Sequence, residues 1–155
     1  MEHTVLSGAP GYYSAFAYWL GALLFIMVSP RKQKGVRLAV VLLFFGVCIV
    51  GFSVLTDTRL PIYFLPCFLS VLTMTFLMIF ICVRGSLMNV AYLCIRAFVL
   101  GEFSAALEWQ CFYYLMTMFD AKWEMICNII IFAAVHLSVF AIMYLLERKY
   151  KEYNT

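Results

Sequence analysis

The sequence predicts an all-α membrane protein, a polytopic bundle of five transmembrane helices. Three observations lead to this prediction: 66% of the 155 residues are hydrophobic, 12% are charged, and the mean hydropathy is +0.97. Soluble domains hold about 25% charged residues. The apolar residues also lie in long runs, and a helix needs about 20 such residues to cross a hydrocarbon core of about 30 Å. We therefore expect one transmembrane domain surrounded by a lipid bilayer.

Five apolar runs fit membrane-spanning helices. Pro10 and Gly11 precede the first run, and Ser29 and Pro30 follow it. Pro61 opens the third run, where its missing N–H does no harm because the first turn of a helix leaves this donor unused. The expected spans are residues 12–28, 38–55, 61–83, 87–108 and 123–146.

Lys and Arg are concentrated in the loops on one side of the predicted bundle. Eight basic residues fall on that side and two on the other. The eight are Arg31, Lys32, Lys34, Arg37, Arg84, Arg148, Lys149 and Lys151. Because basic loops stay in the cytoplasm, we expect the N-terminus outside and the C-terminus in the cytoplasm of a bacterial cytoplasmic membrane, as a five-span chain requires.

The fourth run is too long for a single upright span. From residue 87 to 119 it has 33 residues, which as one helix would be about 50 Å long, against a hydrocarbon core of about 30 Å. We therefore expect this helix to end near Glu108. The aromatic residues 110–119 then form an interfacial segment or re-enter the bilayer.

The fourth run also carries charges at membrane depth. Arg96 falls near the midplane, Glu102 in the outer half, and Glu108 beside Trp109 at the outer interface. A charge near the bilayer centre costs about 2.5–3.5 kcal/mol on insertion scales and usually has a partner. At 100° per residue the three side chains point about 120° apart. Either each meets a different neighbour, or the helix bends at Gly101.

Counting depth along the fifth span gives candidate partners for two of these charges. Asn128 comes level with Glu102, and His136 comes level with Arg96, at about 1.5 Å per residue. A polar cluster of these four residues, open to the outside, is one interpretation. The other is a structural pair of Arg96 and Glu102, with His136 bonded to a backbone carbonyl.

Small residues repeat every fourth position along the same run. Ala97, Gly101 and Ala105 form a stripe that lets another helix approach closely. This stripe predicts either packing within the bundle or the seam of a homodimer.

The motifs of common enzymes are missing from the sequence. It contains no H-E-x-x-H, no Gly-rich phosphate loop and no G-x-S-x-G. There are two histidines, His3 and His136, and six cysteines lie within or beside apolar runs, where small buried thiols are common. We expect no catalysis, no metal site, no cofactor and no nucleic-acid partner.

One stretch of the fourth run resembles a known family. Residues 96–110 read RAFVLGEFSAALEWQ, similar to R-A-F-[IV]-L-A-E-F-A-A-S-L-E-W-Q in the membrane region of Firmicutes sensor histidine kinases of the Agr type, which end in a GHKL-type ATPase domain. Arg96, Glu102, Glu108, Trp109 and Gln110 match, whereas Gly101 and Ser104 replace alanines and Ala106 replaces a serine. Residues 145–150, LLERKY, resemble L-L-E-R-R-Y in the same proteins.

The resemblance implies signal reception. The phosphoacceptor helix and ATP-binding lobe of that family would lie beyond Thr155, so the chain is either the membrane part of a longer kinase or a relative without the kinase core. The expected function is to bind an extracellular peptide or small molecule near Glu102, Glu108 and Trp109 and to change helix packing. The alternatives are a solute transporter or channel with a midplane site at Arg96 and Glu102, and a structural accessory protein.

Overall fold

The structure, a computed structural model, describes residues 11–55, 61–118 and 124–153, and five helices account for nearly all of them. The helices are α1 (Gly11–Val28), α2 (Val36–Leu55), α3 (Pro61–Cys82), α4 (Leu87–Met118) and α5 (Glu124–Tyr153). The all-α prediction is confirmed for these residues. Most helix ends lie within two residues of the prediction, whereas α4 ends ten residues and α5 seven residues later than expected.

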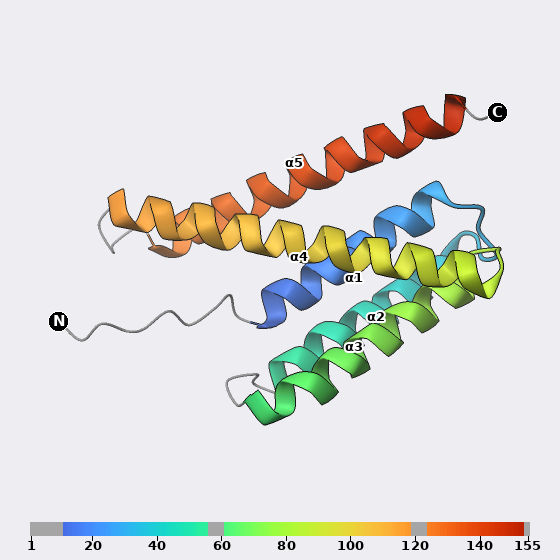
Figure 1. The fold of residues 1–155 in the computed structure, drawn as a ribbon, viewed down its shortest axis with the longest axis horizontal. Helices are drawn as coiled ribbons and strands as arrows, with labels where there is room; N and C mark the ends of the chain where they lie inside the picture. Colours follow the sequence, from blue (N-terminus) through green and yellow to red (C-terminus); the bar gives the residue numbers. More distant parts are fainter. Residues whose placement is uncertain (1–10, 56–60, 119–123, 154–155) are drawn as a thin grey trace.

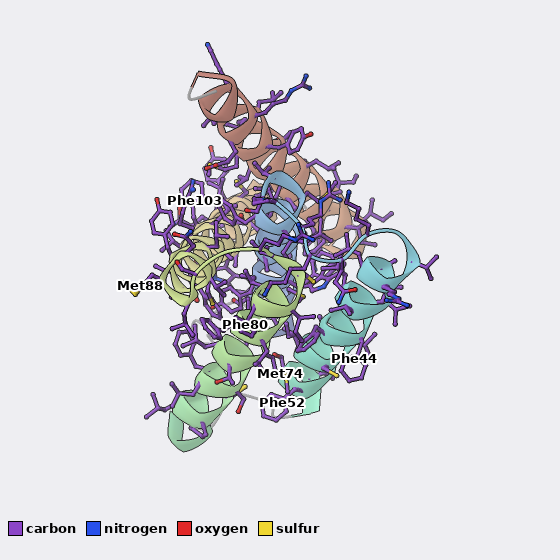
Figure 2. All side chains as sticks on the ribbon, turned by 90° about the vertical axis from the view of Figure 1, so that its right-hand side faces the viewer. Phe44, Phe52, Met74, Phe80, Met88 and Phe103 are labelled. Carbon is purple, nitrogen blue, oxygen red and sulfur yellow. The ribbon has the colours of Figure 1, made fainter. Side chains whose placement is uncertain are left out.

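α1 lies in the middle of the bundle. It contacts all four other helices, with α2 and α3 on one side and α5 on the other (Figure 2). Successive helices run in opposite directions, so the short connections after α1 and α3 lie at one end of the bundle together with the end of α5 (Figure 1). This end holds the basic residues of those two connections and of the last turns of α5.

Four helices contain segments long and apolar enough to cross a membrane. They are Val36–Val54, Leu65–Cys82, Leu87–Leu115 and Ile126–Lys149. The chain is therefore a multi-pass membrane protein. The apolar part of α1, Tyr13–Val28, is shorter, so the fifth span stays a prediction, as does the orientation of the two termini.

Large apolar side chains cover the outside of the bundle. Phe44, Met88 and Phe103 are 63%, 77% and 57% exposed, and Figure 2 places them on its periphery. Soluble monomers rarely expose so much apolar surface. Phe25 and Ile26 of α1, by contrast, are almost completely buried, which agrees with a central helix surrounded by others in a bilayer.

α4 is one continuous helix of 32 residues. The expected helix end near Glu108 is therefore wrong, and the described residues 110–118 are its last turns rather than a separate segment. No glycine or proline occurs between residues 102 and 118 to stop the helix. Its length of about 48 Å exceeds the hydrocarbon core, and tilt or extension beyond the core accommodates the excess.

The small-residue stripe of α4 packs against α1 within the chain. A Cβ on Gly21 would lie 2.7 Å from the backbone oxygen of Ala97, and one on Gly101 would lie 3.1 Å from the backbone carbon of Ala17. Ala97 and Ala105 are buried. We call this contact the α1–α4 seam; because α1 covers it, the stripe is not free to form a homodimer interface.

The two short connections at the basic end are bonded to each other. Lys32 N–H donates to the backbone oxygen of Cys82 at 2.7 Å, and Arg84 N–H donates to that of Pro30 at 2.8 Å. The Lys32 ammonium also donates to the backbone oxygen of Phe80 at 2.9 Å. The basic residues of the first connection are thus held on a fixed backbone at the end where α5 also finishes.

Candidate functional site

Arg96 forms an ion pair with Glu147, near the basic end of α5. Its guanidinium carbon also lies 4.7 Å from the ring centre of Phe25 and 5.4 Å from that of Tyr92, within the range of cation–π attraction. The side chains of Arg96 and Glu147 are 29% and 17% exposed. Arg96 has therefore found its anion on α5, and that anion is not Glu102.

Glu102 faces α1 instead. It accepts a hydrogen bond from the hydroxyl of Tyr18. Tyr18 is itself fixed, because its ring stacks on Phe98 with ring centres 4.3 Å apart. A Cβ on Gly101 would lie 2.6 Å from the Tyr18 ring. Glu102 therefore belongs to the α1–α4 seam.

Glu108 and His136 meet between α4 and α5, inside the protein. Glu108 Oε2 lies 3.9 Å from His136 Nδ1, and the two side chains are 6% and 5% exposed. His136 Nδ1–H donates to the backbone oxygen of Phe132 at 2.9 Å, which is the backbone bond that one of the two interpretations anticipated. Glu108 is thus a core residue rather than an interfacial one.

α4 and α5 form a helical hairpin. Its register explains why Arg96 meets Glu147 and why Glu108 meets His136. Glu108 lies ten residues before the end of α4, and His136 lies twelve residues after the start of α5. Arg96 lies 22 residues before the same end, and Glu147 lies 23 residues after the same start. The predicted levels assumed a fourth helix that ends near Glu108. Because α4 continues to Met118, the partners on α5 shift toward its C-terminal end.

Asn128 lies at the end of the bundle opposite the basic residues, on a pocket between three helices. Its amide Nδ2 donates to the hydroxyl of Tyr13 at 2.6 Å. The pocket has a volume of about 330 Å³. It is lined by Tyr13 and Phe16 of α1, Val50 of α2, and Asn128, Ile129 and Phe132 of α5.

The structure separates the four residues of the predicted polar cluster. Arg96 meets Glu147, Glu102 meets Tyr18, Asn128 meets Tyr13, and His136 meets Glu108. The three charges of α4 thus have three different partners, the first of the two alternatives derived from their spacing. Trp109 is half-buried and packs on Phe112, one turn later in the same helix, at 5.9 Å between ring centres.

Sequence reasoning missed the residues that complete these pairs. Tyr13 and Tyr18 lie in a run that reads as uniformly apolar, so nothing in their neighbourhood marks them as partners. Glu147 did carry a signal, because it is the first charged residue at the end of the fifth run. Its distance from Arg96 could not be judged without the length of α4.

We call the contact made by Arg96 with Glu147 and by Glu108 with His136 the α4–α5 seam. The described residues include no group of three or more His, Cys, Asp or Glu side chains arranged to hold a metal ion. The six cysteines form no disulfide with one another. The side chains of the α4–α5 seam supply acidic, basic and hydrogen-bonding groups.

Comparison of the chain with protein-family models, curated proteins and solved structures gives no match.

Proposed function

We propose that this chain is the signal-receiving membrane domain of a bacterial sensor, with a binding site for a small apolar or amphipathic molecule in the pocket between α1, α2 and α5. The observation that carries the proposal is the pocket itself: its walls are almost entirely apolar, and they include one polar pair, Asn128 and Tyr13. Such a site suits a ligand with a large apolar part and a single polar group.

The position of the pocket supports an external ligand. Tyr13 and Asn128 lie near the beginnings of α1 and α5, at the end opposite the basic connections (Figure 1). If the basic end is cytoplasmic, the pocket opens toward the outer leaflet. A peptide or small molecule would then reach it from outside the cell, and Glu102, Glu108 and Trp109 would not be its main contacts.

α5 supplies the route for a signal. It contributes three of the six pocket residues and, at its other end, Glu147, which holds Arg96 of α4. Suppose that α5 can occupy two placements relative to the other helices. A ligand that binds one placement more tightly would raise the population of that placement. In this proposal, ligand binding in the pocket moves α5 and thereby changes the ion pair of Arg96 with Glu147 near the cytoplasmic side.

The geometry favours this function over solute transport. A transport site at Arg96 and Glu102 would need the two side chains to face one solute, but each is bonded to a different helix. The choice of a sensor rather than another membrane protein rests on the resemblance of residues 96–110 to Agr-type kinases. Catalysis has no place in the proposal, and a homodimer would need a surface other than the α1–α4 seam.

Photocrosslinking in living bacteria tests the proposal directly. The photoreactive residue p-benzoylphenylalanine replaces Ile129, which lines the pocket, and in a second strain Leu137, which is 72% exposed on the same helix. We expect an adduct of one defined molecule at position 129, identified by mass spectrometry, and lipid adducts at position 137. Lipid adducts alone at both positions would favour the accessory-protein alternative.

A further inference from the structure

Two buried polar atoms in the α4–α5 seam have no hydrogen-bond partner. They are Glu108 Oε2 and His136 Nε2, and both side chains are more than nine-tenths buried. Buried polar atoms are nearly always paired, because leaving one unpaired costs its full desolvation. The pocket does not explain them, since neither residue lines it.

Both atoms are hydrogen-bond acceptors, and neither has a hydrogen-bond donor. His136 Nδ1–H already donates to the Phe132 carbonyl, so in the neutral ring Nε2 carries a lone pair, and a carboxylate oxygen accepts only. Neither atom has appreciable surface open to water. A water molecule or an ammonium group needs more room than this. A proton needs no such room, because it binds covalently to the oxygen or to the nitrogen.

Charge balance points to the same ligand. Without an added proton, the pair carries one negative charge. The imidazole is surrounded by Phe132, Phe16 and Phe140, with ring centres 4.3, 6.3 and 6.0 Å away. An uncompensated carboxylate is expensive in such surroundings. One added proton makes the pair neutral whether it sits on the carboxyl oxygen or on the imidazole.

The other titratable and charged groups of the packed helices have separate partners or lie elsewhere on their helix. Tyr13 of α1 accepts from Asn128, and Tyr18 of α1 donates to Glu102. Arg96 of α4 pairs with Glu147 of α5. The thiol of Cys111 lies three residues beyond Glu108 and is half-buried. Among the residues that the structure describes, Glu108 and His136 therefore face each other without a third charge beside them.

We propose that Glu108 and His136 form a single proton-binding site within the membrane, and that the bound proton keeps α5 packed against α4. The proton comes from water and returns to water as hydronium, so the charge of the pair changes between zero and minus one. Its release would draw water to the carboxylate. α5 can move more easily than α4, because 17% of an 18-residue stretch within Ile126–Lys149 is buried, against 44% of one within Leu87–Leu115 of α4. The proposal stands even if the pocket holds no ligand.

Infrared and nitrogen NMR spectra of the full chain in lipid nanodiscs test this proposal. We expect a protonated-carboxyl band to change between about pH 4 and about pH 9, to disappear in Glu108→Gln and to persist in the matched control Glu102→Gln. In His136→Gln the midpoint of the band should move by about one pH unit or more, because two coupled groups titrate together.

The unmodified protein provides a second readout that needs no variant. With ¹⁵N-labelled histidine it gives signals from two residues, His3 and His136. The signal of His136 should change at the same midpoint as the carboxyl band. A carboxyl band that survives Glu108→Gln, or a His136 signal that titrates independently of the band, would overturn the proposal.

Discussion

The two seams of α4 differ in what holds them together. Against α1, α4 presents Ala97 and Gly101, and the helix backbones come so close that an added Cβ on Gly21 or Gly101 would collide. Against α5, it presents Arg96 and Glu108, whose polar heads meet Glu147 and His136. Close backbone packing has one solution, since the atoms either fit or clash. Pairs of long polar side chains tolerate movement, so we infer that α1 and α4 form the frame and α5 the adjustable helix.

The largest effect should come from filling the α1–α4 seam. In Gly21→Ala the new Cβ meets a backbone oxygen 2.7 Å away, which cannot move without shifting α4. We expect the free energy of unfolding to fall by about 2–3 kcal/mol, measured by helical circular dichroism during unfolding in SDS.

Gly51→Ala is the matched control, because its Cβ would meet nothing within 4 Å. Alanine is the better helix former by about 1 kcal/mol, so this variant should lose no stability. If Gly21→Ala and Gly51→Ala have the same free energy of unfolding, close backbone packing is not what holds the α1–α4 seam together.

Breaking the ion pair of the α4–α5 seam should cost less. Glu147→Gln leaves Arg96 with its two aromatic contacts but without an anion. Because both side chains are partly exposed, we expect a loss of about 1–2 kcal/mol, between that of a buried charged hydrogen bond and that of a surface pair. The exposed Lys149→Gln serves as control.

A double-mutant cycle sharpens this second prediction. Arg96→Gln together with Glu147→Gln should lose about as much stability as either change alone, because each removes the same interaction. Two losses that simply add would show that Arg96 and Glu147 act independently.

The smallest effect should come from the polar pair that lines the pocket. Asn128→Ala removes the 2.6 Å hydrogen bond to Tyr13, and interhelical hydrogen bonds in membranes average about 0.6 kcal/mol. Stability should change by about this amount, whereas the photoadduct at position 129 should weaken clearly. Asn89→Ala, an exposed asparagine at the basic end, should leave the adduct unchanged.

Local patterns in the sequence were sufficient for the helices and for the grouping of charges. Apolar runs located all five helices to within about two residues at most ends, because run length and flanking Gly, Pro and charged residues are local properties. The basic residues of the first and third connections do gather at one end of the bundle (Figure 1). The backbone bond of His136 is also local, since Phe132 is one turn away.

The partners across helices could not be derived in this way. The predicted level of Arg96 with His136 assumed a fourth helix that ends at Glu108. Because the helix continues to Met118, Arg96 instead meets Glu147, eleven residues further along α5. Bilayer thickness limits the apolar length of a span, but it does not fix tilt or how far a helix projects.

The sequence by itself determined that this is a multi-pass helical membrane protein, where its helices lie and which side chains are too polar to face lipid. The tertiary structure decided that Ala97 and Gly101 meet α1, that Arg96 pairs with Glu147, and that Glu108 is buried beside His136. The physical reason is that polarity and helix length are properties of one segment. Which groups meet depends on the register between segments, and register follows from every helix end and turn in the chain.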